Sequence, residues 1–303
     1  MSRAASPSAK KPYGLQRVCR VWRIPRSTAQ RHRAQQQRIG PPPPDRRRGP
    51  ASAMTDETLL DEIRSTLQAS PWSGQGYRKT WAQLRHRGIR TAARRVLRLM
   101  RDHGLLAPTR AGRARGPRTH DGTIIPEAPD RRWGTDATSV MTGEGRATVF
   151  ILVDHFTGEC LGIHAARVGT RFEALEPLRQ AVPALFGSYR SAVAADAGLE
   201  LRHDHGSQYT SDVFQDELAF LGITSSPSYV RAPEGNGSAE RFIRTLKEQL
   251  LWLERFDGIE SLTRALHDFR ERFNQTWIMH RHGFRTPAQV RAEHATTALE
   301  AAA

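Results

Sequence analysis

Apolar positions near the N-terminus recur at helical spacing, and a break divides them between two helices. The first helix has its apolar positions at Leu15, Val18, Cys19 and Trp22. The break Arg23-Ile24-Pro25 precedes a second helical stretch, from Arg26 to about Gln36, that is rich in Arg. Two short helices around a tight turn are typical of a helix-turn-helix, which would bring Arg26 to DNA, although two solvated basic helices have the same pattern.

A second group of helices is predicted over 56–107. The first of them has one apolar stripe, formed by Leu59, Leu60, Ile63 and Leu67. Two more helices are expected at Tyr77–Arg87 and Ala92–His103, each closed by a glycine, with Thr91 as the N-cap of the last. The outward face of that last helix is cationic and contains Arg94, Arg95, Arg98 and Arg101. A merely solvated face would normally include Glu, so this one favours DNA in a major groove.

From about Arg131 the apolar period changes from helical to alternating, which indicates a different fold class. The expected strands are Trp133–Val140, Thr148–Asp154, Cys160–His164, Leu199–Asp204 and Ile223–Ser228. The expected helices between and after them are Thr170–Leu185, Asp212–Leu221 and a long one from Asn236 to about Phe256. This order predicts an α/β domain with a mixed sheet, preceded by all-α helix-turn-helix units.

Charge divides the chain in the same way. The 303 residues carry a formal net charge of +15. Residues 1–120 hold 27 basic and 6 acidic side chains, whereas 121–303 hold 19 and 25. A cationic region of that size favours nucleic acid as the partner. Segments rich in Pro or Arg at 38–55 and 108–125 are expected to be linkers, and the first of them separates the basic arm and first helix pair, 1–37, from the other helices.

Composition excludes several other classes. The longest strictly apolar run is Val149 to Val153, which is too short to span a membrane. No apolar segment comes after the basic N-terminus, so we expect no signal peptide. The two cysteines, Cys19 and Cys160, are too far apart in sequence to suggest a disulfide framework or a zinc knuckle. A reducing cytoplasm is the expected setting.

Three acidic residues occur where a sheet enzyme would place them. Asp136 lies in the first expected strand, Asp204 ends a later strand, and Glu240 lies in the first turn of the long helix. Asp204 follows Asp136 by 68 positions, and 35 residues separate Asp204 from Glu240. Carboxylates are hard oxygen ligands of the kind that Mg²⁺ prefers.

These motifs, taken in order, resemble those of a known family. The matching segments are Tyr77-Arg78 with the helix Arg94 to Arg101, Trp133-Gly134-Thr135-Asp136-Ala137-Thr138, Val153-Asp154-His155-Phe156-Thr157, Asp204-His205-Gly206-Ser207-Gln208-Tyr209-Thr210-Ser211, Asn236-Gly237-Ser238-Ala239-Glu240-Arg241-Phe242-Ile243-Arg244-Thr245-Leu246-Lys247, and Phe273-Asn274 through Thr286-Pro287-Ala288. Residues 57–290 thereby resemble the transposases of bacterial insertion sequences with an integrase-type catalytic core. More narrowly, they are similar to the second reading frame of the IS-three family.

The resemblance implies a ribonuclease-H-like core at 126–256, with 257–303 as a helical extension. It implies a catalytic triad of Asp136, Asp204 and Glu240 that holds two Mg²⁺ ions, for which Mn²⁺ would substitute. The implied activity is DNA cleavage and strand transfer at the ends of an insertion sequence. The implied partners are the terminal inverted repeats, target DNA, further copies of the chain and a first-reading-frame product, in the nucleoid of a bacterial cell.

Helical spacing adds two cations to the site. Arg244 and Lys247 follow Glu240 at i+4 and i+7, so all three share a face and the cations would meet the DNA backbone. A solvated Glu–Arg pair is the alternative.

Five other residues are weaker candidates for the site. His203 and His205 resemble a metal motif, but packing or DNA contact is the expected role of both. Asp154 is expected to be a structural acid in a turn, Asp196 lies in an Ala-rich loop, and Tyr209 is expected to pack or to stack on DNA. Two rival functions stay open, a DNA-binding regulator with an inactive core and a structure-selective nuclease.

Overall fold

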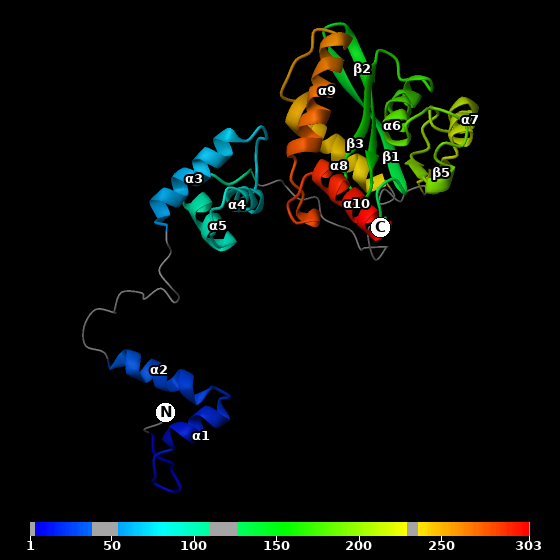
Figure 1. Cartoon of the computed structure of the whole chain (residues 1–303). Coiled ribbons are helices and arrows are strands. Elements are labelled where there is room, and N and C mark those ends of the chain that lie inside the picture. The colour runs from blue at the N-terminus through cyan, green and yellow to red at the C-terminus, as the bar shows by residue number, and fades with distance from the viewer. Residues whose placement is uncertain (1–3, 38–53, 109–125, 229–235, 303) are drawn as a thin grey trace. The chain divides into compact units, whose positions relative to one another are not determined.

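The computed structural model describes residues 4–37, 54–108, 126–228 and 236–302 (Figure 1). Most of the expected linkers at 38–55 and 108–125 lies outside these ranges, as does Gly235, which directly precedes the third acidic motif. The chain forms two units, Met1–Thr55 and Asp56–Ala303.

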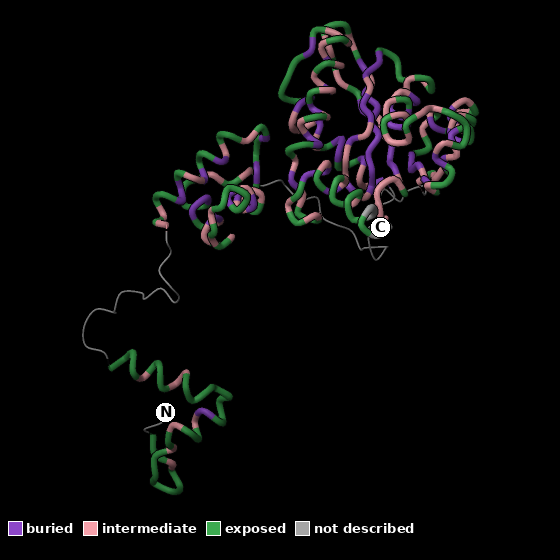
Figure 2. Tube along the Cα trace, viewed as in Figure 1, coloured by how far each residue is buried: buried purple, intermediate pink, exposed green. Residues whose placement is uncertain are grey.

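The N-terminal unit contains the two expected helices, α1 (Gly14–Val21) and α2 (Arg26–Gln36). Cys19 is the one buried residue of these two helices. Figure 2 colours most of this unit as exposed. The apolar side chains at the turn between the helices are exposed too, with Val21 at 71%, Trp22 at 58% and Ile24 at 41%. The pair therefore has the predicted helices but buries little apolar surface of its own.

Three helices open the second unit: α3 (Asp56–Ala69), α4 (Tyr77–His86) and α5 (Ala93–Asp102). Their common core contains Leu59, Ile63, Leu84, Val96 and Met100. Both predicted glycine stops have positive φ, +84° at Gly88 and +66° at Gly104, which favours glycine at a helix end. Thr91 as N-cap was wrong. Ala92 caps α5 without a side-chain hydrogen bond, and the Thr91 carbonyl instead accepts one from the Trp81 indole at 2.8 Å.

Five strands form one mixed sheet: β1 (Arg132–Thr142), β2 (Gly145–Asp154), β3 (Cys160–Ala166), β4 (Glu200–His203) and β5 (Thr224–Pro227). Their order across the sheet is β3-β2-β1-β4-β5. The first three strands pair antiparallel, whereas β1, β4 and β5 pair parallel. The predicted mixed sheet and its order of elements are confirmed.

The helices of this domain follow the predicted order. They are α6 (Glu176–Phe186), α7 (Asp212–Leu221), α8 (Gly237–Leu246), α9 (Ile259–Thr276) and α10 (Pro287–Ala302), with a short 3-10 turn, η1 (Glu173–Leu175), before α6. The bounds of α7 match the prediction because local signals set both ends. Ser211 Oγ accepts a hydrogen bond from the Phe214 amide, and Gly222 adopts the left-handed conformation that ends the helix.

The expected long helix to Phe256 was wrong, because α8 stops at Leu246. A π-helical turn, η4 (Lys247–Leu251), takes its place. Leu246, Leu250 and Leu251 are all buried. Because a π turn is wider than a turn of α-helix, Leu250 and Leu251 both reach the core that contains Leu246.

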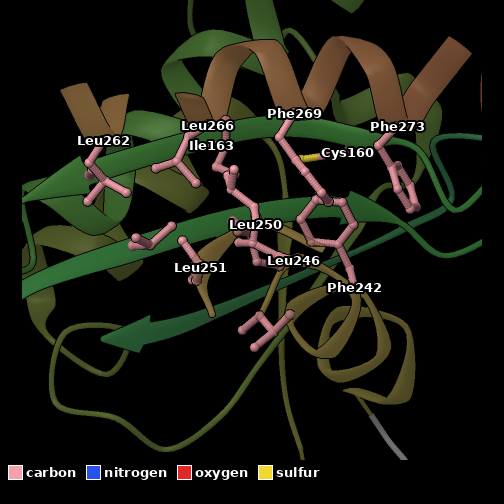
Figure 3. Packing of buried hydrophobic residues seen from close by; sticks show 14 of the residues in the cluster. Cys160, Ile163, Phe242, Leu246, Leu250, Leu251, Leu262, Leu266, Phe269 and Phe273 are labelled. Atoms are coloured by element: carbon pink, nitrogen blue, oxygen red, sulfur yellow. The ribbon is translucent and has the colours of Figure 1, made fainter. Parts of the chain in front are cut away.

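Strand β2 is buried on both faces and divides the domain into two cores. Val149, Ile151 and Val153 lie in one cluster, and Phe150 and Leu152 lie in the other. Figure 3 shows the first cluster, where side chains of α8, η4 and α9 pack over β3, among them Phe242, Leu250, Leu266, Phe269 and Phe273. The second cluster contains residues of α6 and α7.

The loop between α3 and α4 contributes to the first cluster. Trp72 is 4% exposed and packs edge-on against three aromatic rings, those of Phe269, Phe273 and Trp277. Its indole donates a hydrogen bond to the hydroxyl of Thr276 at 3.0 Å. This tryptophan therefore ties the three N-terminal helices of the unit to α9.

In the parts of the chain that the structure describes, no helix is both long and apolar enough to cross a bilayer.

We expect Trp72→Ala to lower the free energy of unfolding by about 3–5 kcal/mol, because it leaves a cavity among packed aromatic rings. Trp252 is the matched control, since its side chain is 69% exposed. Trp252→Ala should change the free energy by no more than about 0.5 kcal/mol. Denaturant titrations of the two variants measure both values, and equal losses would contradict the packing described for Trp72.

Candidate active site

The pairing of β1 with β4 brings two acidic residues to the same level of the sheet. Arg132 pairs with Glu200 and Gly134 with Arg202, so each β1 residue opposes the residue 68 positions later. Extended by two residues, this register places Asp136 level with Asp204, just beyond the end of β4. Adjacent parallel strands lie about 4.8 Å apart and opposing residues point to the same face, so both carboxylates lie on one face.

The Asp136 carboxyl group lies in an environment that disfavours its charge. Burial raises its pKa to about 6, and the charges of Asp204 and Glu240 act in the same direction. A hydrogen bond of 2.8 Å from the Ala137 amide to Asp136 Oδ1 and the charge of Lys247 act in the opposite direction. The three predicted carboxylates and Lys247 are therefore electrostatically coupled.

Asp204 is exposed, and a local turn holds its side chain. The Gly206 amide donates a hydrogen bond to Asp204 Oδ1 at 2.8 Å. Its neighbour His203 is 1% exposed, with one ring nitrogen 2.9 Å from Ser225 Oγ and the other 2.7 Å from the Asp204 carbonyl oxygen. Both nitrogens are thus engaged in hydrogen bonds within the protein, so of the two roles that the sequence left open for His203, packing or DNA contact, the structure favours packing.

Glu240 lies one turn into α8, and the start of that helix is fixed to β1. Asn236, the N-cap residue, donates from Nδ2 to the carbonyl oxygen of Thr135 at 2.9 Å and does not cap the helix with its side chain. Thr135 directly precedes Asp136. This bond sets the position of Glu240 relative to Asp136, and partial burial raises the pKa of Glu240.

A glycine permits this close approach of the helix to the strand. A Cβ at Gly134 would lie 2.6 Å from His155 Nε2 and 2.7 Å from Asn236 Oδ1. His155 is 5% exposed, and burial is the main reason that its pKa is lowered to about 4. A neutral imidazole and an amide therefore pack directly over the strand that carries Asp136. Both residues belong to motifs that the sequence reveals, but no role was predicted for either of them.

The three carboxylates affect one another's charge, but their side chains do not form a ready-made metal site. Among the described residues, no group of three His, Cys, Asp or Glu side chains is arranged to hold one metal ion. The chemistry of the donors still fits divalent cations, because the charges of Asp204 and Glu240 both act on the partly buried carboxyl group of Asp136, where a further negative charge is disfavoured. Mg²⁺ keeps several water ligands, so it needs only a few carboxylates.

The two cations predicted on the α8 face have different surroundings. The charge of Lys247 acts on Asp136. Arg244 instead forms an ion pair with Glu248 at 3.0 Å and remains 59% exposed. Lys247 is therefore the cation that acts on the acids, whereas Arg244 is paired with Glu248.

Three other acidic or aromatic candidates have structural positions. Asp154 is fully buried and accepts hydrogen bonds from the backbone and hydroxyl of Thr157 and from the amide of Asp130, as expected of a structural turn. Tyr209 is also fully buried and packs against Phe214, so it is a packing residue. Asp196 lies in a short 3-10 turn that precedes β4, whereas Asp204 follows the opposite end of that strand.

The arginines predicted to contact DNA fall into two groups. Arg26, Arg94 and Arg101 are exposed, and in the part of the chain that the structure describes none of them forms an ion pair. Arg95 and Arg98 instead bind Asp56 at 2.7 and 2.6 Å, and Arg98 also pairs with Asp102. The two arginines lower the pKa of Asp56 to about 2. The α5 face is therefore less purely cationic than its own sequence indicates.

We expect Asp136→Asn to stabilise the metal-free protein at pH 8. The pKa of Asp136 is about 6 when folded, above the ordinary 3.8. Its contribution to the stability of the folded state is fully present below pH ~4, and this contribution of at most about 3 kcal/mol is lost as the pH rises through about 6.

Urea titrations in a chelator at pH 4 and pH 8 measure the effect. Asp136→Asn should gain stability over the wild type at pH 8 and little at pH 4. Asp216→Asn, which changes an exposed carboxylate on α7, should differ from the wild type by no more than about 0.5 kcal/mol at either pH. An Asp136→Asn variant that is less stable than the wild type at pH 8 would contradict the buried environment of this carboxylate.

Three family models match the chain. An HTH-like domain model matches residues 55–113. One integrase core domain model matches residues 126–233, and a second matches residues 221–292. The integrase models thus cover the sheet, α8 and α9, and the HTH-like model covers α3 to α5.

The curated relatives are transposases. The chain is 27% identical over 261 residues to the transposase InsD for insertion element IS2A/D/F/H/I/K of Escherichia coli, an alignment that covers 83% of this chain and 84% of the relative. The InsD of IS2-9 in strain K12 matches to the same identity, with 82% of the relative covered.

Among solved structures, the catalytic core domain of BIV integrase matches with a TM-score of 0.42 and 20% identity, over 56% of this chain and 99% of that one. A chain of the simian T-cell lymphotropic virus intasome, solved in complex with a PP2A regulatory subunit, matches with a TM-score of 0.45 and 20% identity, over 70% of each chain. By its family matches and its curated relatives, the chain contains an HTH-like domain and an integrase core and is homologous to insertion-element transposases.

Proposed function

We propose that the chain cuts DNA at the ends of an insertion sequence and transfers the freed strand ends to target DNA, with Asp136, Asp204 and Glu240 as its catalytic carboxylates. The observation that carries this proposal is the β1–β4 register, whose 68-residue offset equals the interval between Asp136 and Asp204, together with the bond from Asn236 at the start of α8 to Thr135. The raised pKa of Asp136 supports it, since carboxylates that repel one another in a partly buried position favour the binding of cations.

The three carboxylates would hold two Mg²⁺ ions, or Mn²⁺ in their place. When bound, such a pair of ions stabilises negative charge on the attacking and leaving oxygens of a phosphodiester. Asn236 holds the start of α8 against β1, which would keep Glu240 near Asp136. Lys247 adds a positive charge beside the acids, where a phosphate of the substrate would lie. Tyr209 is buried, so it forms no covalent intermediate with DNA.

The cationic N-terminal region would hold the duplex. Arg26 on α2 and Arg94 and Arg101 on α5 are exposed and would contact DNA phosphates, most naturally at the terminal inverted repeats. Arg95 and Arg98 would first have to exchange Asp56 for a phosphate. Self-association on DNA, cooperation with a first-reading-frame product and a location at the bacterial nucleoid belong to the same proposal.

A strand-cleavage assay tests the proposal on DNA that carries the ends of the element. Asp136→Asn, Asp204→Asn and Glu240→Gln should each remove metal-dependent cleavage, by about a hundredfold or more, while DNA binding stays close to the wild type. Each substitution removes one oxygen ligand and leaves the arginines unchanged. Cleavage near the wild-type rate in any variant would exclude that residue from the triad.

The same assay separates the rival functions. A DNA-binding regulator would bind the ends in Mg²⁺ without cutting them, and a structure-selective nuclease would cut without joining the freed 3′ end to a second duplex.

Lys247→Ala should slow cleavage and joining by about tenfold or more at saturating DNA, because it removes a positive charge next to the reacting phosphate. Lys247→Arg should recover part of that loss, since a planar guanidinium replaces a compact charge. Arg244→Ala is the control on the same helix, and its effect at saturation should be smaller because Arg244 faces Glu248. The double substitution should be the slowest variant. Wild-type rates for Lys247→Ala would show that Lys247 is merely solvated.

A further inference from the structure

A pocket of about 550 Å³ lies among α4, α8 and the segment after α9. Four cationic side chains line it: Lys79 from α4, Arg241 and Arg244 from α8, and Arg281. The Trp277 ring forms part of its wall. The pocket therefore joins the HTH-like region to the helix that carries Glu240, on the flank of that helix.

Lys79 is the most unusual member of this set. Its ammonium lies 3.1 Å from the centroid of the Trp277 ring. Its Nζ is buried, and the described residues provide no hydrogen-bond acceptor for it. Burial lowers the pKa of Lys79 to about 7. A buried ammonium without an acceptor is costly, and an anion placed in the pocket would remove that cost.

The arginines of the pocket outnumber the acidic residues that line it. Burial and the nearby charge of Arg241 lower the pKa of Arg281, whose guanidinium donates to the Phe156 carbonyl at 3.0 Å. Glu248 is the one acidic residue among the pocket's lining residues, and it is paired with Arg244 at 3.0 Å. Four cations thus face one carboxylate.

We propose that this pocket binds one backbone phosphate of DNA, held jointly by Lys79, Arg241 and Arg281. The inference rests on the proposed function, because it takes DNA as the substrate. Ser238 and Arg241, on either side of Glu240 in the first turns of α8, both line the pocket, so the pocket lies within one helical turn of the candidate carboxylate. Arginine and lysine together match a phosphate, which accepts both paired guanidinium bonds and a point charge. The bound phosphate would couple α4 to α8, and so connect recognition of the duplex with the placement of Glu240.

Lysine NMR tests the pocket in the full chain without any substitution. The sequence has four lysines, Lys10, Lys11, Lys79 and Lys247, so a protein with isotope-labelled lysine gives few signals. The Lys79 signal should titrate near pH 7 in the free protein. A short DNA duplex should raise that pKa by one unit or more, and inorganic phosphate at high concentration should raise it in the same direction.

Three outcomes would overturn the assignment. The first is a Lys79 pKa that changes with neither the duplex nor any other anion. The second is a shift with inorganic phosphate but none with DNA, which would make the pocket a small-anion site. The third is a shift with poly-glutamate but none with DNA, which would make it a site for acidic protein segments.

A salt series on the affinity for DNA provides the second test. Lys79→Met should weaken binding severalfold and reduce the slope of log affinity against log salt by about 0.9, the contribution of one phosphate contact. Lys79→Arg keeps the charge and should keep the slope. Arg264→Gln, which removes an exposed cation of α9 outside the pocket, is the charge control and should keep the slope as well.

Equal slopes for Lys79→Met and the wild type would overturn the phosphate contact even if the protein cleaves DNA normally. Failure of the catalytic proposal would look different. Glu240→Gln would then cleave at the wild-type rate while the Lys79 signal still responds to DNA.

Discussion

The parallel pairing of β1 with β4 is the constraint on which the candidate site depends. Its 68-residue offset equals the sequence interval between Asp136 and Asp204, so the hydrogen bonds of the sheet bring two distant acids to one level. A slip by one residue would turn one carboxylate to the opposite face. The buried run of β2 fixes β1 from its other side, and β4 is fixed by its pairing with β5 and by Leu201, which is buried in the second core. Packing and strand pairing away from the acids thus contribute to their alignment.

The third acid reaches the sheet through a contact that only glycine permits. Gly134 leaves space for the Asn236 amide and the His155 ring, and Asn236 then bonds to the strand one residue before Asp136. A larger residue at this position would push α8 outwards and move Glu240 with it. The cost of this arrangement is a buried imidazole that stays neutral at physiological pH. The same small residue therefore serves close packing and the geometry of the site.

Local signals in the sequence predicted the features that depend on neighbouring residues alone. Ser211 and Gly222 set the ends of α7, and the apolar run Val149–Val153 predicted a buried strand. The order of elements and the likeness of the acidic motifs then sufficed to predict the fold and to nominate the triad. The π turn after Leu246 could not be predicted, because it depends on how Leu250 and Leu251 pack against α9 and β3, which are distant in sequence. The pairing of Arg95 and Arg98 with Asp56 joins residues 39 and 42 positions apart, so no helical pattern reveals it.

Helix α8 separates two groups of like charge that are each unbalanced in the chain alone. On one side, burial raises the pKa of Asp136, and the charge of Glu240 acts in the same direction. On its flank, burial and the charge of Arg241 lower the pKa of Arg281, near Lys79, whose ammonium has no hydrogen-bond acceptor among the described residues. Both groups destabilise the free protein, and both would be relieved by ligands of opposite charge, cations for the acids and phosphate for the bases. Because ligands that bind the folded state stabilise it, metal and DNA would each tighten the same helix from different sides. If the proposed metal and phosphate sites are both occupied, α8 would therefore be more stable than in the free protein.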